Sequence, residues 1–195
     1  MPDRPPEPYA QSGERRSLRI LGISGSLRAD SSNTRLIEAA AFCAPEGMEL
    51  IAYRDLGHLP FFNPDLDRDP LPAHVAALRT MVGASDGLLI CSPEYARGVA
   101  GAMKNALDWL VSSFEFPGKP VALINASQRA HDADAHLRLT LRTMNAHFVG
   151  GASLTVPLLG RSKSAREIAA EPHLREQIAA ALLALRDAIT SRGAS

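Results

Sequence analysis

The segment 22–34, which overlaps the end of an apolar run at 18–24, is rich in hydrogen-bond donors. Gly25 allows a tight turn and a close approach of the backbone to a ligand. The guanidinium of Arg28 can bind two oxygens of one phosphate, and a helix that starts here would point its free amides at the same place. The side-chain donors are Ser26, Arg28, Ser31, Ser32, Asn33 and Thr34. This chemistry predicts a phosphate-binding loop.

A plainer interpretation is a polar turn in which Ser32 or Asn33 caps the following helix. No Gly-Lys-Ser/Thr follows, so the segment is not a nucleoside-triphosphate loop. Gly22 and Gly25 also lack the spacing of the dinucleotide-binding fingerprint. If the loop binds a phosphate, a mononucleotide fits better than a dinucleotide.

Two further polar segments follow apolar runs. In the first, Pro93 restricts the backbone, Tyr95 offers an aromatic surface, Arg97 adds a cation and Gly98 adds a flexible point. Such a loop can supply a flat contact and backbone amides to a ring such as a flavin. The second segment spans residues 125–131 and contains Ser127 and Arg129. Its alternative interpretation is a solvated loop before a helix capped by Asp132.

Short apolar runs alternate with segments of helical periodicity along the chain. We expect strands at 18–24, 48–54, 86–92, 120–127 and 151–159, and helices at 33–44, 72–85, 100–114, 132–147 and 172–191. The alternation predicts right-handed parallel crossovers in an α/β fold, a flavodoxin-like three-layer sandwich with a five-stranded parallel sheet. Ligands of such folds bind at the carboxyl ends of the strands, so the three polar loops should meet there, far from the N-terminus and the final helix.

Composition excludes several classes of protein. The chain has 195 residues, of which 46% are hydrophobic, and 21 basic residues balance 21 acidic ones. A net charge of zero provides no basic surface that would attract nucleic acid or an anionic membrane. No apolar stretch is long enough to span a bilayer. We expect a cytoplasmic protein with a flexible Pro-rich tail at 1–17 and one domain at 18–195.

We expect neither a metal site nor a framework of disulfide bonds in this protein. The six histidines show no metal-ligand spacing, so we expect no metal site. We expect the two cysteines, Cys43 and Cys91, to be small buried core residues.

Two motifs carry a family resemblance. The segments GSLRxxSxN (25–33) and SPEYxxGxxGxxKNALDW (92–109) resemble the NADPH-dependent FMN reductase family, which includes quinone, azo-dye and chromate reductases. The resemblance extends from about residue 18 to about residue 150. Many members carry Asn where this chain has Ala96, and Pro where it has Ala100. The loss of the Asn removes one polar contact near the ring or the substrate.

The resemblance implies a flavin site with named residues. Ser26, Arg28, Ser31 and Asn33 match the phosphate-binding positions, and Ser32 and Thr34 are their neighbours. The ring would be bordered by Pro93, Glu94 and Tyr95, by the adjoining Ala96, Arg97 and Gly98, and by Ser127 on its pyrimidine side. Arg129 would balance charge on the reduced flavin or bind the phosphate of NADPH. The helix residues Lys104, Asn105, Asp108 and Trp109 would be mainly structural, with Trp109 packed and Lys104 and Asn105 holding the loop or a subunit contact.

The implied activity is hydride transfer from NADPH or NADH to bound FMN, followed by electron transfer to a quinone, azo compound, flavin or metal oxyanion. No side chain has to act as acid or base, so no catalytic residue is assigned. The family implies a homodimer or homotetramer. The alternatives are an FMN-binding electron carrier or regulatory module without its own NAD(P)H oxidation, and a flavin-free enzyme that binds phosphate esters. Neutral net charge argues against the carrier, and Tyr95 within the family motif argues against the last.

Overall fold

The computed structural model describes residues 16–158 and 163–192. Its main sheet is parallel, in the order β2-β1-β3-β6-β7, and β8 pairs with β6 beyond the end of β7. This is the flavodoxin-like order expected from the sequence. The strands are β1 (Leu18–Ser24), β2 (Met48–Tyr53), β3 (Gly87–Cys91), β6 (Pro120–Asn125), β7 (His147–Phe148) and β8 (Leu154–Thr155).

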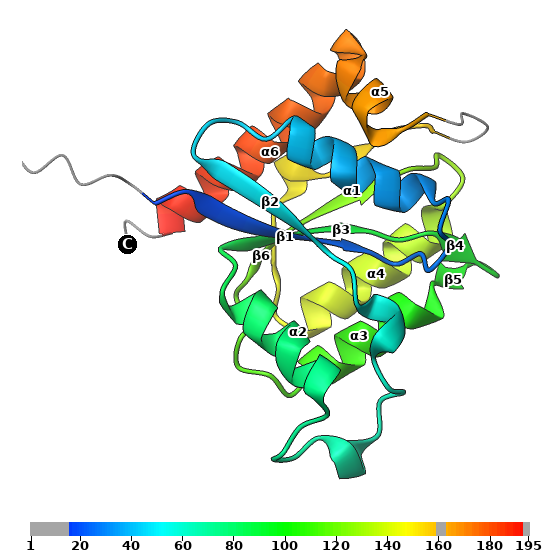
Figure 1. The fold of residues 1–195 in the computed structure, drawn as a ribbon, viewed down its shortest axis with the longest axis vertical. Helices are drawn as coiled ribbons and strands as arrows, with labels where there is room; N and C mark the ends of the chain where they lie inside the picture. Colours follow the sequence, from blue (N-terminus) through cyan, green and yellow to red (C-terminus); the bar gives the residue numbers. More distant parts are fainter. Residues whose placement is uncertain (1–15, 159–162, 193–195) are drawn as a thin grey trace, which may run out of the picture.

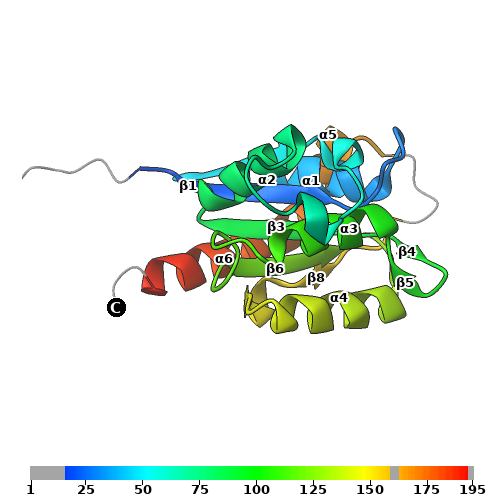
Figure 2. The same ribbon diagram turned by 90° about the horizontal axis from the view of Figure 1, so that it is seen from below.

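Helices cover both faces of the sheet, as Figures 1 and 2 show. One face packs against α1 (Ser32–Phe42), α5 (Ala165–Ala170) and α6 (Pro172–Arg192). The opposite face packs against α2 (Ala73–Gly83), α3 (Gly101–Leu110) and α4 (His131–Thr143). Each interface has its own apolar core. All five residues of β3 are buried, because a central parallel strand is covered on both sides.

The expected fifth strand at 151–159 is wrong in its bounds. The chain enters the sheet earlier, as β7 beside Pro120 and Val121, and then turns through the short 3₁₀ helix η3 (Gly150–Ala152). It returns to the sheet as β8 beside Ile124 and Asn125. The turn at the glycines divides one strand position into two short pieces. Leu159 lies outside the described residues.

The helices also differ from expectation: α3 ends at Leu110 instead of 114, α4 ends early, and α5 is additional. Helix α4 ends at Thr143 instead of 147, because Asn145 adopts a left-handed conformation with φ +60° that ends the helix before β7. Helix α5 was not expected. Ser164 and Glu167 form a capping box at its start, a Ser-x-x-Glu signal that is visible in the sequence.

The start of β1 and the C-terminal end of α6 lie at the side of the molecule opposite the hairpin of β4 (Glu94–Tyr95) and β5 (Gly98–Val99) (Figure 1). Most of the expected tail, residues 1–15, lies outside the described residues. Arg16 is described, and its guanidinium bonds the carboxylate of Asp86. Within the described ranges, no helix is long and apolar enough to cross a membrane.

Candidate functional site

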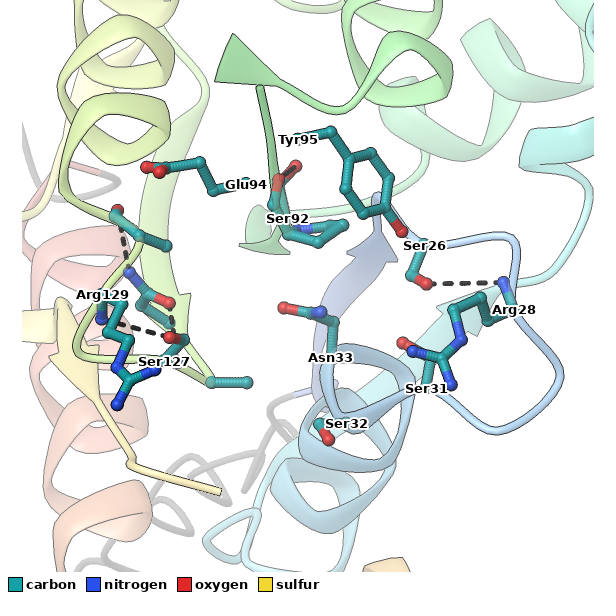
Figure 3. A pocket seen from close by; sticks show the side chains of 14 residues that line it. Ser26, Arg28, Ser31, Ser32, Asn33, Ser92, Glu94, Tyr95, Ser127 and Arg129 are labelled. Carbon is teal, nitrogen blue, oxygen red and sulfur yellow. Dashed lines mark hydrogen bonds between the residues drawn. The ribbon is translucent and has the colours of Figure 1, made fainter. Parts of the chain in front are cut away.

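The loops after β1, β3 and β6 meet at the carboxyl edge of the sheet, as their positions in the sequence predict, and enclose a cavity of about 300 Å³ (Figure 3). The cavity lies where parallel folds of this type bind ligands. Its lining is Ser26, Arg28, Ser31, Ser32, Asn33, Ser92, Pro93, Glu94, Tyr95, Asn125, Ala126, Ser127, Arg129 and Ala130.

The first loop is held by short polar contacts. The hydroxyl of Ser31 accepts a hydrogen bond from the Thr34 backbone N–H, so Ser31 caps α1, and the expectation that Ser32 or Asn33 would do so is wrong. Gly25 donates its N–H to the Cys91 carbonyl at 2.7 Å. A Cβ at residue 25 would lie 2.6 Å from the Ser92 hydroxyl, so only glycine lets the first and second loops approach this closely.

The electrostatics of the cavity favour an anion. Arg28 and Arg129 both line it, and neither has a carboxylate partner among the described residues. Glu94 also lines the cavity, but its carboxylate accepts the Ala133 backbone N–H at 2.9 Å. In Figure 3 the Glu94 side chain runs away from the centre of the cavity. Two guanidinium groups without described carboxylate partners and the start of α1 therefore face a ligand there.

The second loop is a β-hairpin docked on α4. Strands β4 (Glu94–Tyr95) and β5 (Gly98–Val99) pair antiparallel around Ala96 and Arg97, which both have positive φ, +48° and +61°. Helix α4 has no side-chain cap from its own N-cap residue, Ala130, and Glu94 supplies one from the hairpin. The expected cap at Asp132 is therefore wrong; Asp132 instead pairs with Arg97 at 3.1 Å.

The third loop is ordered by its own side chains. Ser127 donates its N–H to Asn125 Oδ1 at 2.9 Å, and Arg129 donates its N–H to Ser127 Oγ at 3.1 Å. Across the cavity, Tyr95 is 51% exposed and its ring lies above Ser26 in Figure 3. The aromatic ring of Tyr95 and the ordered loop after β6 thus line the same cavity as the phosphate-type donors.

Nine of the residues expected from the sequence line the cavity, and four do not. Thr34 turns inward and hydrogen-bonds Ser24 at 2.9 Å, while Ala96, Arg97 and Gly98 form the hairpin turn. The nine are Ser26, Arg28, Ser31, Ser32, Asn33, Pro93, Glu94, Tyr95 and Ser127.

The expected set omitted four lining residues besides Arg129, which was already named as a charge near the ring. Ser92 adjoins the Pro-Glu-Tyr motif, and Asn125, Ala126 and Ala130 flank Ser127. Because these residues follow the ends of β3 and β6 closely in the sequence, they could have been included in the expected lining.

The motif helix α3 is structural, as the resemblance implied. Trp109 is fully buried, and its Nε1 donates to the Pro60 carbonyl at 2.8 Å. Asn105 donates to the same carbonyl and accepts the Phe62 N–H, so it holds the loop before α2. Lys104 pairs with Asp108 along the helix.

Comparison with known proteins shows the family to which this chain is related. Residues 18–158 match the model of the family described as NADPH-dependent FMN reductase. An NAD(P)H-dependent FMN reductase of Pseudomonas aeruginosa is 38% identical over 135 residues, which cover 67% of this chain and 72% of that protein. A 2-hydroxy-1,4-benzoquinone reductase of a Burkholderia species is 39% identical over 128 residues, covering 63% and 69%.

A solved structure shares the fold. The flavoenzyme NAD(P)H:(acceptor) oxidoreductase FerB from Paracoccus denitrificans superimposes with a TM-score of 0.67 at 25% identity, covering 87% of this chain and 98% of that one. The family match spans both loop motifs and all the strands of the sheet. The chain therefore belongs to the NADPH-dependent FMN reductase family.

Proposed function

We propose that the cavity at the carboxyl edge of the sheet binds FMN through the residues described above. The chain is an NAD(P)H-dependent FMN oxidoreductase with quinone-type acceptors. The observation that carries the site is the meeting, on one cavity, of a loop rich in phosphate donors with a loop that bears an exposed aromatic ring.

The phosphate of FMN would be held by the first loop. Ser26, Ser31 and Ser32 offer hydroxyls, Asn33 offers an amide and Arg28 offers a guanidinium without a described ion-pair partner. The first turn of α1 adds backbone N–H groups and the positive end of the helix dipole. This set of donors fits a phosphate monoester.

The flavin ring would be bordered by Pro93 and Tyr95 on one side and by Ser127 on the other. Four expected residues lie outside the lining and would support the site indirectly. Thr34 does so through its hydrogen bond to Ser24. The other three, Ala96, Arg97 and Gly98, form the turn that carries Tyr95. Arg129 is placed to interact with negative charge on the ring or on a phosphate of the nicotinamide nucleotide.

When bound, FMN supplies the redox chemistry by accepting a hydride from the nicotinamide and passing electrons to the acceptor. The residues of the chain bind and orient the reactants. Tyr95, which is half exposed, borders the open side of the cavity where both substrates would enter in turn. We propose a quinone as the acceptor, since the Burkholderia relative is named as a benzoquinone reductase.

One experiment tests this function directly. Purified protein loaded with FMN is titrated anaerobically with NADPH and with NADH while the flavin absorbance is recorded, and a small quinone is then added. We expect bleaching by at least one nucleotide and recovery of the absorbance on addition of quinone. A flavin that ignores both nucleotides would favour the electron carrier, and failure to take up FMN would refute the site.

We further propose that the protein assembles as a homodimer or homotetramer and works in the cytoplasm. Exposed apolar side chains support assembly: Phe61 is 90% exposed and Phe114 is 98% exposed. Both cysteines are free and buried, which suits a reducing compartment. Light scattering coupled to gel filtration tests the assembly, and a monomeric mass would contradict it.

A further inference from the structure

Cys91 stands at the point where the three loops of the cavity meet. It is the last residue of β3, it is fully buried, and it directly precedes the Ser-Pro-Glu-Tyr loop. Its sulfur lies 3.1 Å from Oδ1 of Asn33, in the first turn of α1. The backbone of Ala126, in the loop after β6, also hydrogen-bonds the sulfur. One thiol therefore contacts all three walls of the site.

The direction of these bonds follows from the chemistry of the groups. Asn33 Oδ1 has only lone pairs, so the Cys91 S–H must donate to it, while the sulfur accepts the Ala126 N–H. Burial raises the pKa of the Cys91 thiol, so the proton is retained at neutral pH. The thiol thus acts as donor and acceptor at once.

The bond to Cys91 fixes the orientation of the Asn33 amide. With Oδ1 at the sulfur, Nδ2 is left as the free donor of a side chain that lines the cavity. No hydrogen bond among the described residues uses Nδ2. An amide turned the other way would leave the buried S–H without this acceptor and would present an acceptor to the cavity.

We propose that Cys91 is a positioning residue for the flavin site: its S–H holds the Asn33 amide so that Nδ2 is presented as a donor to the bound FMN. This inference rests on the proposed function. The burial of Cys91 in the core confirms the expectation from the sequence, and the proposed role adds to it. The same thiol contacts both α1 and the loop after β6.

Three variants separate positioning from packing. Cys91→Ser keeps a donor and an acceptor but loses volume, Cys91→Val fills the volume but has no donor, and Asn33→Ala removes the oriented amide. FMN is titrated into each apoprotein, and the dissociation constant is measured by the change in flavin fluorescence. The thermal unfolding temperature of each apoprotein is also measured, because a change in packing alone would change that temperature.

We expect Cys91→Ser to bind FMN within about two-fold of the wild type, and Cys91→Val to bind about three- to ten-fold more weakly, as for one lost hydrogen bond. In an Asn33→Ala background, Cys91→Val should cause no further loss of affinity, because the amide it would orient is gone. Should Cys91→Val not fold, Cys91→Ala takes its place in the same comparison.

The opposite ranking would overturn the inference. If Cys91→Val binds like the wild type and Cys91→Ser loses affinity in step with its unfolding temperature, then Cys91 acts through packing alone. Additive losses in the Asn33→Ala background would equally exclude a role through Asn33. Failure of the wild-type apoprotein to bind FMN is a separate result, which refutes the proposed function itself.

Discussion

At the scale of single residues, the site is defined by charges that have no described partner. Arg28 and Arg129 line the cavity without carboxylate partners in the described ranges, whereas Glu94 is occupied by the Ala133 N–H. Figure 3 places these two guanidinium groups on opposite sides of the cavity, so an anionic ligand there would be attracted from both sides. The charges of the described residues therefore favour a negatively charged ligand in this cavity.

Arg28→Ala should weaken FMN binding by about 1–3 kcal/mol, the usual effect of losing a charge-assisted hydrogen bond. Arg186→Ala is the matched control, because Arg186 is an arginine on α6 that pairs with its neighbour Asp187 and does not line the cavity. The dissociation constants of both variants are measured by titration of the apoprotein. If Arg28→Ala and the control bind FMN with equal affinity, the phosphate must bind in another part of the cavity.

At the scale of elements, the β4–β5 hairpin and helix α4 form one unit. Glu94 caps the helix from the hairpin, and Arg97 pairs with Asp132 in the first helical turn. The hairpin carries Tyr95 to the rim of the cavity. The position of this aromatic surface therefore depends on an element that follows more than thirty residues later in the sequence.

Glu94→Ala should destabilise the protein by about 1 kcal/mol, the typical loss for a helix cap. Glu94→Gln should retain most of the stability, because its amide oxygen still accepts the Ala133 N–H. The free energy of unfolding in urea measures both. If glutamine and alanine destabilise the protein equally, the charge of Glu94 and not its hydrogen bond supports α4.

The turn of the hairpin is strained at Ala96, which has φ +48°. Glycine reaches this conformation without steric cost, so Ala96→Gly should stabilise the protein by roughly 0.5–1 kcal/mol. Ala135→Gly, on an exposed position of α4, should instead destabilise it by a similar amount, about 0.5–1 kcal/mol. Urea unfolding compares the two, and loss of stability in both variants would show that the turn carries no strain.

At the scale of the whole molecule, the first described residues are tied to the sheet through Asp86. Burial raises the pKa of this carboxyl, but the Arg16 guanidinium and the Arg19 N–H outweigh burial and hold the pKa below its ordinary value. A lowered pKa in the folded state means that the ionised carboxylate stabilises the fold. This stabilisation is present above the ordinary pKa of 3.8 and is lost as the pH falls through the lower, folded value.

Asp86→Asn should therefore lower the free energy of unfolding at pH 7 and flatten its decline below pH ~4. Urea unfolding at pH 7, 5 and 3 measures the dependence. Asp187→Asn is the control, since that carboxylate is exposed on α6 and should leave the acid-induced decline unchanged. A decline in Asp86→Asn as steep as that of the wild type would assign the acid sensitivity to other carboxylates.

Much of this architecture could be predicted from the sequence. Apolar runs in the sequence predicted the strands β1, β2, β3 and β6. Their parallel order predicted that the loops containing Arg28, Tyr95 and Ser127 would meet. Local pattern could not predict the cap that Glu94 gives α4, because it joins segments far apart in the chain. The split of the last strand was also missed, since glycines at the turn carry no strand or helix periodicity.

We propose that FMN lies in this cavity with its phosphate at the first loop and its ring between Tyr95 and Ser127. A crystal structure of the protein with FMN bound would locate the flavin. We predict phosphate density in contact with Ser26, Arg28 and Asn33, and ring density against the hairpin that carries Tyr95. Flavin density elsewhere on the molecule, or a flavin in this cavity with its phosphate directed away from Arg28, would refute this binding mode.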